Sequence, residues 1–315
     1  MKNQLRGTIS AYLLAAVVPL GAFAEQEDYF NQSVHDSGGA LEFTKNIETE
    51  KSPWKEPVSL ISGDPKLNPE IWFNDVEIWR PEGKGPFPAV VMMHGCGGAS
   101  SADTFPDWGN RYKEMGYISM LVDGFSSRGF SHQCRRYGAN FTRATVLDRV
   151  RDAYRALHML ADHPDIDPNR IYIHGWSNGG AAVLSALTPD IHEWIPGTED
   201  NPEVWRHRFA GGIAYYPPCG HMGGSREFSA PLLIVIGEDD DWTWAHRCKP
   251  VVNVKAGDRK GEILVIENAT HSFDLMSWDG YHTTSRSRYG ARMVPNRNAK
   301  DLAIKRVKQF LKSIQ

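Results

Sequence analysis

The stretch Ile171–Gly180 constrains the fold of this chain more than any other part of the sequence. It reads Ile-Tyr-Ile-His-Gly-Trp-Ser-Asn-Gly-Gly, an apolar run followed by small residues that suit the start of a helix. Residues 175–179 have the G-x-S-x-G spacing of a sharp strand-to-helix turn that raises a serine hydroxyl above the sheet edge. The pattern predicts Ser177 as a nucleophile at a helix amino end, where free N–H groups favour negative charge. The alternative is an ordinary Gly/Ser turn, because the motif alone is common.

Apolar runs and amphipathic stripes alternate along the rest of the chain. Continuous apolar runs, typical of strands buried on both faces, occupy residues 89–93, 118–122, 211–216, 231–236 and 263–266, and residues 71–80 resemble an edge strand. The clearest helical stripes cover residues 146–161 and 299–314. This spacing predicts one α/β domain with a mostly parallel, doubly wound sheet and helices on both faces. Ligands of such sheets bind beyond the carboxyl ends of the strands.

The first 24 residues differ from the rest. Lys2 and Arg6 precede an almost wholly apolar stretch, which ends in Ala22-Phe23-Ala24, an A-x-A cleavage pattern. We therefore predict a signal peptide over residues 1–24, since the run is short for a membrane anchor. Residues 25–69 are polar and poorly periodic, which indicates an extended arm, and residues 70–315 form the predicted domain. A periplasmic or secreted protein is expected, without stable membrane insertion after cleavage.

Charge and cysteine content narrow the possible partners. The formal net charge is −3, and it becomes −5 once Lys2 and Arg6 are removed with the leader. No Lys/Arg run stands out, so a nucleic-acid partner is not expected. In an exported protein, an even count of four cysteines indicates two disulfides. No C-x-x-C pair or histidine cluster indicates a metal site, and the oligomeric state is left open.

A serine hydroxyl needs a base, and the base needs an orienting acid. After the apolar run at 231–236 comes Gly-Glu-Asp-Asp-Asp at 237–241, and after the run at 263–266 comes a segment that contains His271. We predict His271 as the base, because the competitors His221, His246 and His282 are less well placed in the chain. The acid stays open at this point among Glu238, Asp239, Asp240 and Asp241.

Stabilising an oxyanion requires two hydrogen-bond donors. The backbone N–H of Asn178, just after the predicted nucleophile, is one candidate. The glycine-rich sequence His-Gly-Cys-Gly-Gly at 94–98 directly follows a predicted central strand. We expect the second donor to the oxyanion to be the backbone N–H of Cys96. The alternative is that this glycine-rich sequence only forms a tight turn between strand and helix.

Together these segments resemble the dienelactone hydrolase family of α/β-hydrolases, in particular its exported members. The resemblance covers the chain from about Pro81 to the end and is carried by the segments 85–95, 123–129, 175–180, 237–243 and 271–273. It implies the α/β-hydrolase fold, a Ser-His-Asp triad and hydrolysis of a small carboxylic ester or lactone without a cofactor. The family's G-x-x-D pattern falls on Asp240, with Asp239 and Asp241 as alternatives. Carbohydrate acyl esterases, peptidases and non-catalytic binding proteins are the rival interpretations.

Two departures from the family pattern matter. Founding members use a cysteine nucleophile, whereas this chain has Ser177, which favours a general ester or lactone hydrolase. Founding members also bind a substrate carboxylate through arginines, and here Arg128 is the one candidate, unless it pairs with a nearby acid. Trp176 is a further candidate for contact with substrate, as an apolar wall beside the serine.

In this fold, loops that follow neighbouring strands approach each other at the active-site edge. Cys96 and Cys134 follow two strands that should be neighbours, and so do Cys219 and Cys248. We therefore predict the disulfides Cys96–Cys134 and Cys219–Cys248. The alternative is a free Cys96 thiol that lines the pocket.

Overall fold

The computed structural model describes residues 76–134, 144–195, 202–222, 227–252, 261–278 and 290–315. The predicted signal peptide, the arm and the first part of the predicted edge strand lie outside these residues. Seven strands form one sheet in the order β1-β3-β2-β4-β5-β6-β7. Strand β1 pairs antiparallel with β3, and all other pairs are parallel. The strands are β1 Val76–Trp79, β2 Phe87–Met93, β3 Ile118–Val122, β4 Ile166–Trp176, β5 Gly211–Tyr215, β6 Leu232–Gly237 and β7 Gly261–Ile266.

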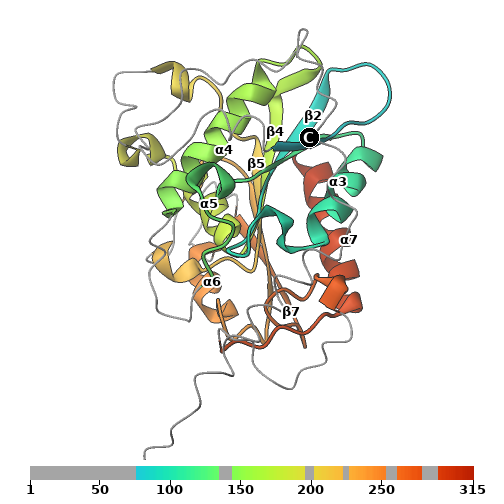
Figure 1. Ribbon diagram of the computed structural model, residues 1–315, viewed down its shortest axis with the longest axis vertical. Coiled ribbons are helices and arrows are strands. Elements are labelled where there is room, and N and C mark those ends of the chain that lie inside the picture. Colours follow the sequence, from blue (N-terminus) through green and yellow to red (C-terminus); the bar gives the residue numbers. More distant parts are fainter. Residues whose placement is uncertain (1–75, 135–143, 196–201, 223–226, 253–260, 279–289) are drawn as a thin grey trace, which may run out of the picture. The chain divides into compact units, whose positions relative to one another are not determined.

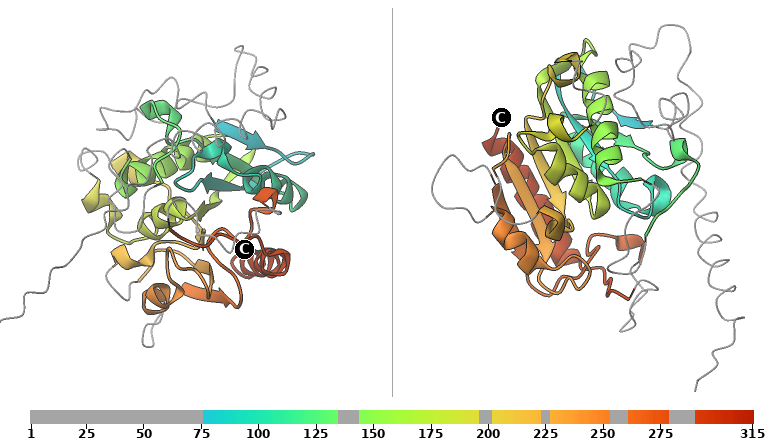
Figure 2. Two further views of the ribbon diagram at one scale, coloured as in Figure 1. Left: turned by 60° about the horizontal axis from the view of Figure 1, so that its bottom comes forward. Right: turned by 90° about the vertical axis from the view of Figure 1, so that its left-hand side faces the viewer.

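Helices cover both faces of this sheet. Figure 1 shows α4 and α5 on one side of the strands and α3 and α7 on the other, and Figure 2 gives the same layering from two further directions. The helices are α3 Thr104–Glu114, α4 Val146–Ala161, α5 Asn178–Ala186, α6 Ala245–Val252 and α7 Arg297–Ser313. The 3₁₀ turns are η3 Ala99–Ser101, η4 Ser126–Arg128, η5 Ile191–Trp194, η6 Pro202–Trp205, η7 Cys219–Met222 and η8 Met276–Trp278. The predicted doubly wound α/β architecture is confirmed.

The central strands are apolar because both of their faces are covered. All residues of β3, β5 and β6 are buried, as are the last five residues of β2. Each fully buried large apolar side chain contributes roughly 1.5–3 kcal/mol relative to an exposed one. Helix α4 begins as predicted at Val146, where Thr145 and Asp148 form a reciprocal capping box.

Two elements differ from the sequence prediction. Strand β4 starts at Ile166 rather than near Ile171, and it includes Pro168. Proline fits there because β5 pairs with β4 only from Tyr172 onward, so its missing N–H leaves no gap in that ladder. Helix α6 was not predicted; it is only eight residues long and contains Pro250.

Candidate active site

Ser177 lies on the sharp turn between β4 and α5. Its backbone adopts φ 50° and ψ −110°, an unusual conformation for a residue other than glycine. A side chain at Gly175 would come within 2.3 Å of the Gly179 carbonyl oxygen, and one at Gly179 within 2.0 Å of the Met93 carbonyl oxygen. Both glycines are thus required for the turn, which leaves the serine half-buried at the amino end of α5.

The side chains of Ser177, His271 and Asp240 form one hydrogen-bonded chain. His271 Nε2 lies 3.1 Å from Ser177 Oγ, and His271 Nδ1 lies 2.8 Å from Asp240 Oδ2. The three residues come from the loops after β4, β7 and β6, which end at the same edge of the parallel sheet. His271 and Asp240 are 2% and 3% exposed, so water is largely excluded from the bond between them.

Asp240 is held by more donors than the histidine alone. Its Oδ1 accepts the backbone N–H groups of Trp242 at 2.9 Å and Thr243 at 2.8 Å. Its Oδ2 accepts the Thr243 hydroxyl at 2.7 Å in addition to His271. Burial alone would raise the pKa of Asp240, but the interactions with His271 and Thr243 outweigh it and hold that pKa below its usual range.

Thr243 is a residue that the sequence analysis did not single out. Its hydroxyl lies 3.2 Å from His271 Nδ1 as well as 2.7 Å from Asp240 Oδ2. It therefore braces the acid against the base. Thr243 lies three residues after Asp240, a spacing at which an aspartate side chain often accepts a backbone N–H. This local pattern is too common in proteins to identify a site from sequence.

The loop after β2 lies against the serine turn. A side chain at Gly95 would meet the carbonyl oxygen of Trp176 at 3.4 Å and Cβ of Ser177 at 3.5 Å. Among the described residues, no loop or turn hydrogen bond uses the backbone N–H of Cys96 or Asn178 as donor. These two predicted oxyanion donors thus stay available beside the serine.

Both predicted disulfides are present in the structure. Cys96 bonds to Cys134 and Cys219 bonds to Cys248, with Cα–Cα distances of 4.7 Å and 5.0 Å. The pairing follows from the sheet order, in which β2 neighbours β3 and β5 neighbours β6. The first bridge ties the Cys96 loop to the segment after β3.

Gln133, which precedes Cys134, links the two predicted oxyanion donors. Its backbone N–H donates to the Cys96 carbonyl at 2.8 Å, and its side-chain Nε2 lies 3.4 Å from Asn178 Oδ1. The same amide is oriented by paired bonds to the Ala144 backbone, both at 3.0 Å. Sequence reasoning missed Gln133 because its partners are far along the chain.

His94, at the start of the same loop, is fixed by a buried arginine. Its Nε2 accepts from the Gly124 N–H at 3.2 Å and from Arg149 NH1 at 2.9 Å, while Nδ1 lies 2.7 Å from the Gly95 carbonyl. Burial, and then the Arg149 charge, lowers the pKa of His94, which keeps the ring neutral. Arg149 NH2 also binds the His94 carbonyl at 3.1 Å, so this guanidinium orients the start of the loop.

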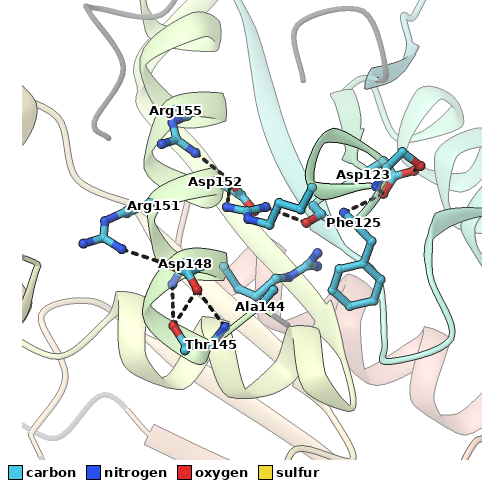
Figure 3. Close-up of polar contacts among 12 residues, drawn as sticks. Asp123, Phe125, Ala144, Thr145, Asp148, Arg151, Asp152 and Arg155 are labelled. Atoms are coloured by element: carbon cyan, nitrogen blue, oxygen red, sulfur yellow. Dashed lines mark hydrogen bonds and ion pairs between the residues drawn. The ribbon is translucent and has the colours of Figure 1, made fainter. Parts of the chain in front are cut away.

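Two candidate substrate contacts are occupied within the protein instead. The Arg128 side chain is fully buried and pairs with Asp152. Asp152 also binds Arg155 (Figure 3). A buried guanidinium needs a counter-charge, and Asp152 supplies it. Trp176 is 2% exposed, stacks on His174 and donates its indole N–H to Asp274 at 3.1 Å. The polar groups of both side chains thus have partners within the protein.

Two aromatic rings pack near the imidazole of His271. The ring centroid of Tyr216 lies 4.6 Å from that of the imidazole, and the centroid of Trp242 lies 4.9 Å from it. Tyr216 is buried, whereas Trp242 is half-exposed. Of these two rings, that of Trp242 is the more exposed to solvent.

Over the part of the chain that the structure describes, no group of three or more His, Cys, Asp or Glu side chains is arranged to hold a metal ion. Within those same residues, no helix is both long and apolar enough to cross a membrane.

Parts of the chain are similar in sequence to known proteins. Residues 90–195, less than half of the chain, match the model of the prolyl oligopeptidase family. A probable 2-oxo-3-(5-oxofuran-2-ylidene)propanoate lactonase from Bradyrhizobium sp is 23% identical over 211 residues, covering 64% of this chain and 79% of that protein. Esterase EstD from Thermotoga maritima is 30% identical over 123 residues, covering 37% of this chain and 26% of that protein. The chain thus spans only about a quarter of the length of EstD.

Solved structures identify the fold. The dienelactone hydrolase-like promiscuous phosphotriesterase P91 from metagenomic libraries superposes with a TM-score of 0.53 at 16% identity, covering 76% of this chain and 92% of that one. The chain thus has the fold of the α/β-hydrolases, and its structural neighbours include dienelactone hydrolase-like proteins.

Proposed function

We propose that this protein is a serine hydrolase that cleaves a carboxylic ester or lactone through an acyl-enzyme. The enzyme class is supported by relatives that are a probable lactonase and an esterase. The observation that carries the proposal is the hydrogen-bonded chain from Ser177 through His271 to Asp240, at 3.1 Å and 2.8 Å. Nucleophile, base and orienting acid follow one another in the order that acyl transfer requires.

In the proposed mechanism, Ser177 Oγ attacks the substrate carbonyl carbon while His271 Nε2 takes its proton. Asp240 accepts a hydrogen bond from Nδ1–H, which fixes the imidazole tautomer and stabilises the imidazolium. The backbone N–H groups of Cys96 and Asn178 bind the tetrahedral oxyanion. As this intermediate collapses, His271 returns the proton to the leaving alkoxide. Water, with His271 again as base, then releases the acid and regenerates Ser177.

A fluorophosphonate probe tests the nucleophile directly. We expect the folded protein to become labelled at Ser177, and Ser177→Ala to abolish the labelling and to lower kcat by several orders of magnitude, because triad members act as a unit. Ser185, a half-buried serine within α5, provides the matched control variant Ser185→Ala. Folded wild-type protein that is neither labelled nor active on any ester would instead identify a binding protein.

A peptidase is the second candidate, because residues 90–195 match the prolyl oligopeptidase family model. A carbohydrate acyl esterase is a further alternative on the same fold. A panel of p-nitrophenyl esters of graded acyl length, lactones, acetylated sugars and prolyl peptide substrates separates these options by kcat/KM. Highest kcat/KM on esters or lactones is expected.

We also propose that the protein is exported to the periplasm or beyond. The charged start, the apolar stretch and the A-x-A pattern of residues 1–24 support this, although they lie outside the described residues. The two disulfides are compatible with an oxidising compartment. Amino-terminal sequencing of the mature protein should find Glu25 as its first residue.

A further inference from the structure

The proposed mechanism does not use the carboxylate of Asp274, which lies near the histidine in sequence. Asp274 follows His271 by three residues and is completely buried. The Tyr216 hydroxyl donates to its Oδ1 at 2.7 Å. The Thr104 hydroxyl at 2.8 Å and the Trp176 indole N–H at 3.1 Å both donate to its Oδ2. The two carboxyl oxygens thus accept three hydrogen bonds, although burial raises the pKa of Asp274.

The three donors come from segments far apart in the chain. Trp176 immediately precedes Ser177, and Tyr216 immediately follows β5. Strand β5 lies between β4, which precedes the serine, and β6, which precedes the acid. Thr104 is the first residue of α3. Asp274 itself belongs to the segment after β7 that contains His271. One buried carboxylate thus joins the serine turn to the histidine loop.

Tyr216 transmits this anchoring to the histidine ring. Its backbone has φ 36°, a left-handed conformation that bulky side chains rarely adopt and that persists only where surrounding contacts enforce it. Two bonds do so here: its N–H donates to the Val235 carbonyl at 2.6 Å, and its hydroxyl donates to Asp274. The ring held in this way packs on the imidazole of His271, with 4.6 Å between centroids.

We propose that Asp274 is a positioning residue that, through Tyr216, holds the imidazole of His271 in line with Ser177. The inference rests on the proposed function and deepens it. Asp240 fixes the Nδ1 edge of the ring, whereas Tyr216 limits its tilt and displacement. Without the hydroxyl bond, the ring of Tyr216 loses its anchor and His271 gains freedom to move away from the serine.

Two substitutions of similar size, each of which removes one hydrogen-bond donor to Asp274, test the proposal. Tyr216→Phe keeps the aromatic ring and removes the hydroxyl, and with it the bond to Asp274. Thr104→Val removes a different bond to the same carboxylate and is the matched control, because Thr104 has no described contact with Ser177 or His271. Asp274→Asn is the less useful variant, since it sets an amide N–H₂ against buried donors and threatens folding.

Tyr216→Phe should lower kcat roughly ten- to a hundredfold, as expected when a catalytic group loses its alignment. KM should change by less than about twofold, because ground-state binding is not altered. The rate of fluorophosphonate labelling should fall with kcat. Thr104→Val should keep kcat within about twofold of wild type, even where its melting temperature falls, since the contact between Tyr216 and His271 is untouched.

Equal kcat values in the two variants, whether unchanged or lowered, would overturn the positioning role and leave Asp274 as a structural anchor. A rise in KM without a fall in kcat for Tyr216→Phe would also overturn it. Absence of labelling and of ester hydrolysis in folded wild-type protein would remove the proposed function, and this inference with it. If the wild type is labelled and the two variants have equal kcat values, only this inference is overturned and the proposed function stands.

Discussion

Oδ2 of Asp240 lies 2.8 Å from Nδ1 of His271, whereas the carboxylate of the adjacent Asp241 accepts the Arg292 backbone N–H at 2.8 Å. Asp239, the residue on the other side, is exposed. Three consecutive aspartates in one loop therefore have three different surroundings. Of these side chains, only that of Asp240 is both buried and in contact with the histidine.

Replacing each aspartate by asparagine should separate them. Asp240→Asn should lower kcat by roughly 10³–10⁴-fold, because an amide in that position favours the wrong imidazole tautomer. Asp239→Asn and Asp241→Asn are the matched controls and should stay within a few-fold of wild type. Steady-state kinetics on one activated ester suffice. Similar mild losses at all three positions would contradict the choice of Asp240, and Glu238→Gln would then be the variant to measure.

Gln133→Glu should impair both stability and turnover. The change replaces the amide N–H₂ that donates to the Ala144 carbonyl with an acceptor oxygen, so that two acceptors face each other in a buried setting. We expect a loss of about 1–3 kcal/mol in the free energy of unfolding. A fall in kcat should accompany it, because Gln133 contacts both Cys96 and Asn178.

Urea unfolding and ester kinetics measure both effects of Gln133→Glu. The control is Gln309→Glu, the same chemical change at an exposed position of α7, which should alter stability by less than about 0.5 kcal/mol. If the two variants behaved alike, Gln133 would have no special role in holding the oxyanion loop.

Removing either disulfide should lower stability, but the effects on turnover should differ. The bridges have sequence separations of 38 and 29 residues, for which the chain-entropy model gives about 3–4 kcal/mol each. The double variant Cys96→Ala/Cys134→Ala should also lose kcat, because it frees the loop that bears the proposed oxyanion donor. Cys219→Ala/Cys248→Ala should affect kcat less, since Asp240 keeps its bonds to Thr243.

Urea unfolding and kcat for both double variants, with a thiol count on the wild type, test this expectation. Free thiols in the unreduced wild-type protein, or a double variant as stable as the wild type, would count against it.

Acid should destabilise the fold from just below neutral pH. Burial lowers the pKa of His174, and burial together with the Arg149 charge lowers that of His94, from an ordinary value of 6.5. Below that pH the unfolded chain binds protons that the folded chain does not, so the free energy of unfolding falls as pH falls. Each group contributes a slope of at most about 1.4 kcal/mol per pH unit.

Urea unfolding between pH 7.5 and 5 measures this slope. His174→Phe, which keeps an aromatic ring beside Trp176, should flatten it by removing one of the two groups. His192→Phe, at an exposed position, is the control and should leave the slope unchanged. A slope that is the same in all three proteins would exclude the buried histidine as its source.

Much of the fold was predictable because its determinants are local. Apolar runs marked the central strands, the stripe at 146–161 matched α4, and Gly175 and Gly179 fit the steric needs of the serine turn. The disulfide pairs followed from the order of neighbouring strands. Helix α6 was missed because it is short and contains a proline.

The sequence by itself determined which candidate catalytic residues follow which strands. From this it follows that Ser177, His271 and one acid of the 238–241 group reach the same edge of the sheet. Only the tertiary structure decided which acid turns inward, because side-chain direction in a loop depends on contacts such as those of Asp240 with Thr243. It also directed Arg128 to Asp152 and gathered Thr104, Trp176 and Tyr216 around Asp274. Those partners lie 24 to 170 residues apart in the sequence. Helix and strand periodicities relate only residues close together in the chain, so they do not predict such contacts.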